Sequence, residues 1–185
     1  MKKIGIIGQQ AAGKTTIANI IKELNEDKVV YILKFAEPIY QAWAVLHQDF
    51  KNRGFMQEFG DLAKKYCGIE VFLECFEENV EQFEMDMKGQ TAASILICDD
   101  IRYIFECDTA RRLGFKILAV EADKDTRKAR SEKSGLDFLE NHNSETEIPY
   151  LLSEADYVII NNNISLDHLR DNTKIILGRM FGDSQ

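Results

Sequence analysis

Five short apolar runs are separated by longer amphipathic stretches along the chain. The runs occupy residues 3–7, 29–33, 94–98, 115–120 and 156–160. Each has the length and the apolar character of a buried strand. Because helical patterns lie between them, the chain is predicted to have an α/β fold with a parallel sheet covered on both faces. The run at 94–98 is the most apolar, so we expect it to lie centrally in the sheet.

The stretches between the runs have helical periodicity. Ile17, Ile20, Ile21 and Leu24 follow the spacing i, i+3, i+4, i+7, which places them on one face of a helix. Further helices are predicted at residues 38–47, 55–66, 71–83, 104–113, 124–133 and 166–177, and a short one at 147–154 that Pro149 should break. A polar turn is expected at 49–54, and Ser165 should cap the last helix.

Residues 8–15 read Gly-Gln-Gln-Ala-Ala-Gly-Lys-Thr and fit the P-loop pattern Gly-x-x-x-x-Gly-Lys-Ser/Thr. The pattern lies between a predicted strand and a predicted helix, as a phosphate-binding loop requires. Such a loop turns backbone N–H groups towards an anion, and the helix N-terminus adds its dipole. We therefore expect the phosphates of a nucleotide to contact Gly8, Gln9, Gln10, Ala11, Ala12, Gly13, Lys14, Thr15 and Thr16. A plain tight turn is the alternative interpretation.

The residue types of the loop assign roles to two side chains. Lys14 would reach the β- and γ-phosphates, and the Thr15 hydroxyl would bind Mg²⁺. A carboxylate is also needed near the metal, and Asp99 and Asp100 directly follow the 94–98 strand. One of them would face the metal while the other caps the next helix or holds substrate. The alternative is that both cap that helix.

Several basic residues are candidates for phosphate contacts. Arg102 suits bidentate capture of a phosphate, or a surface ion pair. Arg127 and Arg130 lie three apart on one helical face and can close over a transferring phosphoryl group. Together with Lys128 and Lys133, they can instead form a solvated basic face.

The bulk composition narrows the range of functions. The chain has 185 residues, which suits one domain, and a net charge of −8, which argues against a large nucleic-acid footprint. No stretch approaches the ~20 apolar residues of a membrane span, and the N-terminal run is too short for a signal peptide. The cysteines show no metal-binding spacing, so free thiols in a reducing cytoplasm are expected; they are Cys67, Cys75, Cys98 and Cys107.

Beyond the P-loop, four motifs resemble the deoxynucleoside monophosphate kinase family, the P-loop kinases of the kind encoded by large phages. Residues 35–39 resemble the family's Phe-Ala-Asp-Pro-Leu segment, and Arg53 with 56–61 resembles Arg…Leu-Gln-x-Leu-Gly-Thr-Asp. Residues 100–103 with Glu106 and Gly114 resemble Asp-x-Arg-Phe…Glu…Gly. Residues 142–145, followed by 156–161, resemble the ending His-x-Ser-Glu…Asp…Asn, so the match runs nearly end to end.

The resemblance implies a three-layer P-loop NTPase fold of the NMP-kinase type with a five-stranded parallel sheet. It implies one kinase domain over residues 1–185, with a helical acceptor-binding insert at about 37–83 and a lid at about 121–145. ATP and Mg²⁺ are the expected cofactors, a deoxynucleoside monophosphate is the expected acceptor, and homodimer formation is an open option. The implied catalytic and metal residues are Lys14, Thr15, Asp100, Arg127 and Arg130, and the implied substrate-binding residues are Phe35, Glu37, Arg53, Gln57, Asp99 and Arg102.

The chain departs from the family pattern around the expected acceptor site. Glu37 stands where the family usually has aspartate, and Lys64 and Lys65 stand where it has other residues. Lys14-Thr15 replaces the Lys-Asp of many members. The acceptor is therefore open. One alternative is a kinase of another phosphorylated metabolite, such as dephospho-coenzyme A, and another is a P-loop regulator that binds nucleotide without catalysis.

Overall fold

A computed structural model describes residues 1–46, 53–90, 93–135, 138 and 143–182. The chain divides into two compact units. The first comprises Met1–Ile32 and Thr91–Gln185, and the second comprises Leu33–Gln90. The first unit contains the P-loop, and the second contains the segment in which we expected an acceptor-binding insert.

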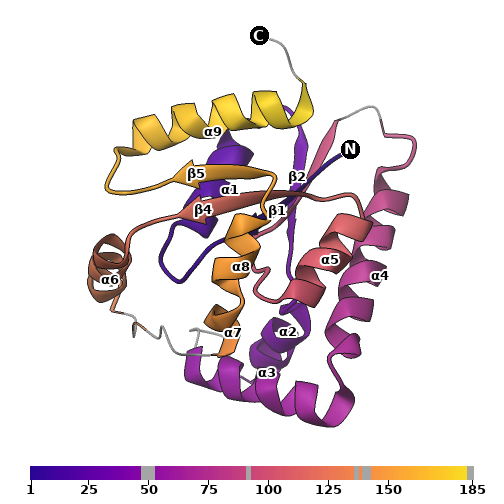
Figure 1. Cartoon of the computed structure of the whole chain (residues 1–185). Coiled ribbons are helices and arrows are strands. Elements are labelled where there is room, and N and C mark those ends of the chain that lie inside the picture. Colours follow the sequence, from indigo (N-terminus) through magenta and orange to yellow (C-terminus); the bar gives the residue numbers. More distant parts are fainter. Residues whose placement is uncertain (47–52, 91–92, 136–137, 139–142, 183–185) are drawn as a thin grey trace. The chain divides into compact units, whose positions relative to one another are not determined.

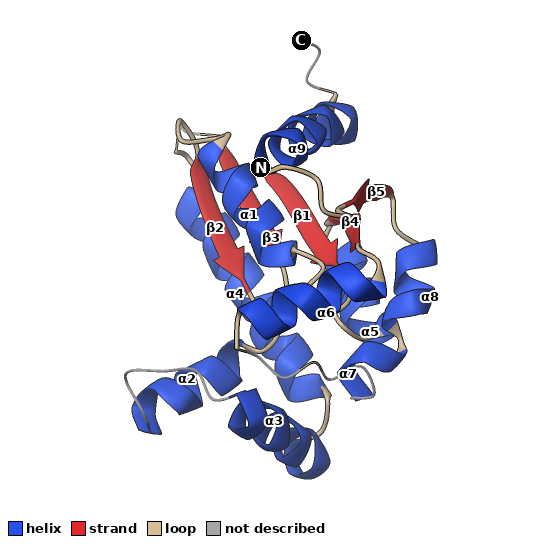
Figure 2. Cartoon of the chain, turned by 90° about the vertical axis from the view of Figure 1, so that its left-hand side faces the viewer, coloured by secondary structure: helices blue, strands red, loops and turns tan. Residues whose placement is uncertain are grey.

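The first unit is built on a five-stranded sheet in the order β2-β3-β1-β4-β5 (Figures 1 and 2). The strands are β1 (Lys2–Ile7), β2 (Val29–Leu33), β3 (Ser94–Cys98), β4 (Lys116–Glu121) and β5 (Tyr157–Ile160). β1 runs parallel to both β3 and β4, and β4 runs parallel to β5. The predicted α/β class and the five-stranded parallel sheet are confirmed. β3 is fully buried, but β1 takes the middle position that we had expected for it.

Helices pack against both faces of this sheet. Those that contact its strands are α1 (Lys14–Glu23), α5 (Ile104–Arg112), α8 (Ile148–Ser153) and α9 (Leu166–Phe181). The first unit also contains α6 (Lys124–Lys133) and α7 (Asn143–Thr146). Side chains alternate between the two faces of a strand. Ile4 and Ile6 therefore join the core beneath α1 and α9. Gly5 faces the other side, where a Cβ would lie 2.7 Å from Ile101 and 2.8 Å from Ile117.

Several helices differ in detail from the prediction. Pro149 lies in the first turn of α8 and does not break it, because the ring replaces an N–H that has no helical partner there. α3 begins at Arg53, so the predicted polar turn does not extend to Gly54; its residues 49–52 lie outside the described part of the chain. α9 continues to Phe181, and Gly182 ends it with a φ of 67°.

The second unit consists of α2 (Glu37–Leu46), α3 (Arg53–Cys67) and α4 (Glu70–Met87). Its small core contains Ile39, Met56 and Phe72. A Cβ on Gly60 would lie 2.9 Å from the Cδ1 atom of Ile39, so the glycine allows α2 and α3 to pack closely. In the described part of both units, no helix combines the length and apolar character that crossing a bilayer requires.

The cap of α9 gives a testable stability prediction. The Ser165 hydroxyl accepts a hydrogen bond of 3.2 Å from the backbone N–H of His168. We expect Ser165→Ala to lower the free energy of unfolding by about 1 kcal/mol, measured by urea denaturation. Ser165→Asp keeps an acceptor oxygen and should retain most of that stability. Equal losses in both variants would contradict a capping role.

Candidate functional site

The P-loop connects β1 to α1 in a conformation that depends on its glycines. Gly13 has a φ of 109°, a region that side chains disfavour. A Cβ on Gly8 would lie 2.5 Å from the carbonyl oxygen of Val120 in β4. A Cβ on Gly13 would lie 2.5 Å from Asn161 Nδ2. Both positions therefore bring the loop into close contact with the carboxyl ends of β4 and β5.

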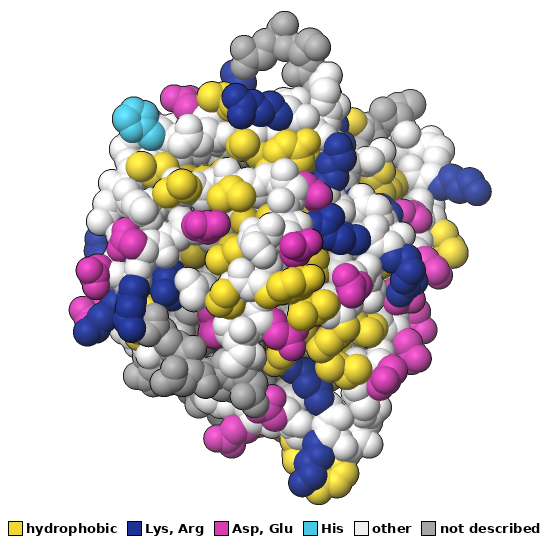
Figure 3. Space-filling model, in the orientation of Figure 1, with side chains coloured by type: hydrophobic (Ala, Val, Ile, Leu, Met, Phe, Trp, Pro, Cys, Tyr) yellow, Lys and Arg dark blue, Asp and Glu magenta, His cyan; other side chains and the backbone are white. Residues whose placement is uncertain are grey.

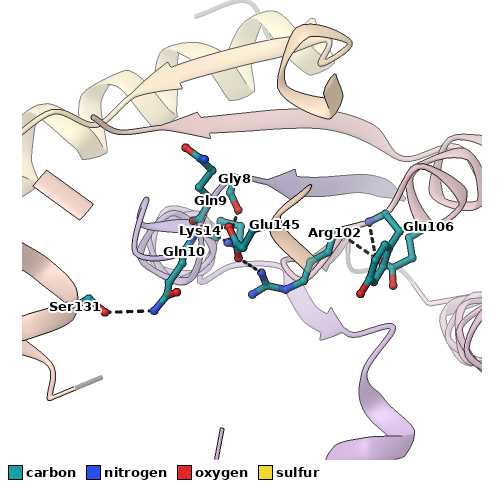
Figure 4. Close-up of polar contacts among 9 residues, drawn as sticks. Gly8, Gln9, Gln10, Lys14, Arg102, Glu106, Ser131 and Glu145 are labelled. Carbon is teal, nitrogen blue, oxygen red and sulfur yellow. Dashed lines mark hydrogen bonds and ion pairs between the residues drawn. The ribbon is translucent and has the colours of Figure 1, made fainter. Parts of the chain in front are cut away.

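Lys14 is buried and its ammonium group lies against the loop itself. Nζ donates to the carbonyl oxygens of Gly8 at 2.6 Å and Gln9 at 3.2 Å (Figure 4). A buried ammonium is costly unless it is hydrogen-bonded, so these carbonyls stabilise the cation inside the loop. The ammonium group of Lys14 thus lies at the loop, as predicted. Its catalytic role stays a prediction.

The Thr15 hydroxyl lies beside Asp99. Thr15 Oγ1 donates to Asp99 Oδ2 over 3.3 Å, and Asp99 is buried. Asp100 Oδ1 instead accepts a hydrogen bond of 3.3 Å from the Cys98 thiol. We had expected Asp100 at the metal and Asp99 at the substrate, whereas the observed contact joins Asp99 to Thr15.

Thr15 and Asp99 fit a magnesium site. Hydroxyl and carboxylate oxygens are the hard ligands that Mg²⁺ prefers, and one or two protein ligands suffice when phosphates and waters supply the rest. Among the described residues, no group of three or more His, Cys, Asp or Glu could hold a metal. A cation here would need further oxygen ligands, such as those of phosphates or waters. Burial, followed by the charge of Asp100, raises the pKa of the neighbouring Cys98 thiol well above its ordinary value.

Arg102 is held close to the P-loop by a buried carboxylate. Its Nη1 donates to Glu145 Oε1 over 2.5 Å, and Glu145 Oε2 accepts the backbone N–H of Gln10 at 3.0 Å (Figure 4). Glu106 fixes the backbone on the other side by accepting the N–H groups of Arg102 at 2.7 Å and Tyr103 at 3.2 Å. The ion pair that we had considered as an alternative for Arg102 is thus present, but its partner is a buried residue at the P-loop.

The two arginines of α6 have different surroundings, and neither belongs to a solvated basic face. Arg127 is buried; Nε donates to the Ala122 carbonyl at 3.2 Å, and its guanidinium carbon lies 5.3 Å from the Phe138 ring centroid. Arg130 donates to the P-loop through the Ala12 carbonyl at 3.3 Å, and to the Asn161 carbonyl at 2.9 Å. Burial lowers the pKa of Arg130 from its ordinary value, although an arginine remains charged at neutral pH.

Three of the four substrate-binding residues predicted in the second unit can be placed. Phe35 is buried and stacks on Phe76 with ring centroids 3.9 Å apart, so its ring is part of the core of that unit. Glu37 is the first residue of α2, and Gln57 lies half-buried in α3. Arg53 begins α3, and its side chain lies outside the described part of the structure.

Reasoning from the residue pattern missed two polar side chains at the site, Glu145 and Asn161. It expected Gln10 at the nucleotide but did not predict the contact that its side chain makes. Glu145 connects Arg102 to the loop, as described above. Gln10 is buried and its Nε2 donates to Ser131 Oγ at 3.3 Å (Figure 4). Asn161 Nδ2 donates to the Ala12 carbonyl at 2.8 Å. The available signal was that Asn161 directly follows a predicted strand, as Asp99 does, and that Glu145 belongs to the fourth resembling motif.

Comparison with solved structures identifies the fold. The chain is 21% identical to TT1252 from Thermus thermophilus with a TM-score of 0.59, covering 96% of this chain and 97% of that one. The chain has the fold of the P-loop kinases. An APS kinase from Mycobacterium tuberculosis, in complex with AMPPNP and APS, matches with a TM-score of 0.57 at 12% identity over 95% of this chain and 96% of the kinase. A sugar kinase from Janibacter matches with a TM-score of 0.51 at 13% identity over 96% and 94%.

These similarities are structural. No family model matches the chain, and no curated protein matches it. At such identities a shared fold does not choose a substrate. On the described part of the face in Figure 3, Lys and Arg side chains are interspersed with Asp and Glu, so this face shows no patch of one charge that would indicate a ligand. The function is therefore argued from the residues at the loop.

Proposed function

We propose that the chain is a kinase that transfers the γ-phosphoryl group of ATP to a nucleoside monophosphate, with a deoxynucleotide as the favoured acceptor. The observation that carries the proposal is the arrangement at the P-loop, where Lys14, the Thr15–Asp99 pair and Arg102 surround one anion-binding loop. Phosphoryl transfer needs little covalent chemistry from the protein, so positioning and charge neutralisation account for most of the catalysis.

Each residue has a role that follows from its chemistry. The backbone N–H groups of the loop hold the phosphates, and Lys14 neutralises the charge that develops as the phosphoryl group moves. Thr15 and Asp99 would hold Mg²⁺, which supplies additional positive charge to the phosphate oxygens when it is bound. Arg130 is hydrogen-bonded to the loop and adds a second cation there. The catalytic roles of Asp100 and Arg127 stay predictions. The contacts described for them are with Cys98 for Asp100, and with Ala122 and Phe138 for Arg127.

The choice of acceptor rests on the resemblance to deoxynucleoside monophosphate kinases. In this proposal Arg102 contacts the phosphate of the acceptor, and Glu37, Arg53 and Gln57 of the second unit contribute to its binding. A cytoplasmic location, the absence of nucleic-acid and membrane partners, and a homodimer remain predictions. The fold is shared with an APS kinase and a sugar kinase, so a different small acceptor is the second candidate.

An acceptor panel tests the proposal directly. ADP release from ATP·Mg²⁺ would be measured with each deoxynucleoside and nucleoside monophosphate and with dephospho-coenzyme A. We expect strong release with one or two deoxynucleotides. Release with dephospho-coenzyme A alone would move the activity to another acceptor. ATP binding with no acceptor-dependent release would instead favour a nucleotide-binding regulator.

The Thr15–Asp99 contact predicts which aspartate serves the metal. We expect Asp99→Asn to lower turnover roughly tenfold to a hundredfold and to raise the Mg²⁺ concentration needed for half-maximal rate, because a charged oxygen ligand is lost. A Mg²⁺ titration of the rate measures both effects. Asp108→Asn, an exposed change on α5, is the control. If Asp100→Asn raised the Mg²⁺ concentration for half-maximal rate more than Asp99→Asn does, Asp100 would be the metal ligand instead.

A further inference from the structure

Glu145 contacts two phosphate-binding elements at once. One carboxylate oxygen accepts the Gln10 N–H of the P-loop, and the other accepts the guanidinium of Arg102 (Figure 4). Its side chain is 4% exposed, whereas that of Arg102 is 26% exposed. A buried carboxylate needs such partners, and each of its oxygens has one. Two elements far apart in sequence, the loop after β1 and the segment after β3, are thereby joined through a third.

We propose that Glu145 is a positioning residue that fixes Arg102 relative to the P-loop, so that Arg102 presents its remaining donors to the phosphate of the acceptor. A guanidinium has five N–H donors. Within the described chain, the Arg102 side chain bonds to Glu145 through Nη1. Because the side chain is also 26% exposed, its other donors can bind a phosphate. The kinetic part of this inference rests on the proposed kinase activity.

The opposite side of the loop is held as well, which makes the position of Gln10 well defined. Its backbone N–H bonds to Glu145, and its side-chain amide bonds to Ser131 of α6. Gln10 is therefore fixed between α6 and α7. Because the loop is held in place, the Glu145 carboxylate that bonds to it also holds the Arg102 guanidinium in one position. A long side chain such as Arg102 otherwise samples many rotamers, and ordering it before the acceptor binds lowers the entropic cost of capture.

A double-mutant cycle separates positioning from general support of the fold. Glutamine has one acceptor oxygen, so Glu145→Gln must lose one of the two contacts. We expect Glu145→Gln to raise the KM of the acceptor about tenfold, with a several-fold smaller effect on the KM of ATP. In an Arg102→Gln background, the same change should alter the acceptor KM less than twofold, because its effect passes through Arg102.

The chain provides a matched control. Glu23 and Arg170 form an ion pair of the same length, 2.5 Å, between α1 and α9, with side chains 53% and 42% exposed. Glu23→Gln therefore makes the same chemical change in another arginine pair of the same unit. It should leave both KM values unchanged. Thermal unfolding of every variant establishes that the protein is folded under assay conditions.

A spectroscopic readout keeps the inference independent of the kinase assignment. In ¹⁵N NMR spectra of the whole chain, the Arg102 Nη–H signals should be resolved in the wild type. They should be averaged in Glu145→Gln, because a neutral amide holds the guanidinium more weakly than a carboxylate does, whichever of the two contacts remains. Glu23→Gln should leave them resolved. If no acceptor is turned over, the proposed function fails, but resolved signals that average in Glu145→Gln would still support the positioning role.

Two results would overturn the inference. One is a set of Arg102 signals that are already averaged in the wild type, because the arginine is then not held. The other is a rise in acceptor KM that is equally large in the Arg102→Gln background, because Glu145 then acts by another route. If Arg102→Gln fails to fold, the NMR comparison of Glu145→Gln with Glu23→Gln decides alone.

Discussion

Lys14→Ala is expected to lower turnover by roughly 10²–10³-fold, the loss typical of removing one preorganised electrostatic donor. Lys14 is the first residue of α1, and its ammonium already lies among the carbonyls of the P-loop. In the proposed reaction it moves from these carbonyls to the phosphates, where negative charge develops. The measurement is the rate of ADP release at saturating ATP and acceptor.

The same helix offers a control for Lys14. Lys22 lies at the exposed end of α1, and Lys22→Ala removes the same charge and the same side chain. We expect its turnover to match the wild type. Because the Gly8 and Gln9 carbonyls lose a donor in Lys14→Ala, circular dichroism must show that the variant is folded. If folded Lys14→Ala turned over at nearly the wild-type rate, the proposal that the P-loop takes part in catalysis would be wrong.

The arrangement of the sheet followed from the sequence because strand and helix periodicities are strong and local. All five predicted strands are present, and the residues after β1, β3 and β4 meet at one edge, as parallel strands require. Strand order within the sheet was harder to predict. The run at 94–98 is the most apolar, yet β1 lies in the middle. Both strands are interior, so burial alone does not distinguish their positions.

The pairing of side chains at the site could not be predicted from periodicity. Asp99 and Asp100 are adjacent and chemically identical, and only the backbone geometry at the end of β3 decides which one meets Thr15. Glu145 accepts an N–H from a residue 135 positions away. A spacing pattern contains no information on such a contact, because it depends on the packing of α7 beside the loop.

Two residues that were predicted to lie at the site, Phe35 and Arg127, are buried and pack against aromatic side chains. An aromatic residue that follows a predicted strand, as Phe35 does, is compatible with either base stacking or a core position. The structure favours the core, since Phe35 stacks on Phe76. Arg127 seemed equivalent to Arg130 because the two are three residues apart. Their contacts differ, since Arg127 lies against Phe138 and Arg130 bonds to the loop.

Gly8→Ala is expected to reduce ATP affinity and turnover at least a hundredfold. The added Cβ would lie 2.5 Å from the Val120 carbonyl, a backbone atom that cannot rotate away. Either the loop or β4 must shift, at a cost of about 1–3 kcal/mol in unfolding free energy. A shift of the loop also moves the Gly8 carbonyl that Lys14 contacts, and displacements of about 1 Å at a catalytic group cost about 10² in rate. Calorimetric ATP binding and urea denaturation measure the two effects.

Gly182→Ala isolates the contribution of backbone strain to this result. Gly182 has a φ of 67°, and a Cβ there would meet nothing within 4 Å. Its substitution therefore carries the cost of a side chain at positive φ, about 1 kcal/mol, without a steric contact. ATP affinity should then be unchanged. If Gly8→Ala lost only as much stability as Gly182→Ala and kept its ATP affinity, the close approach of the loop to β4 would not be what makes glycine necessary at position 8.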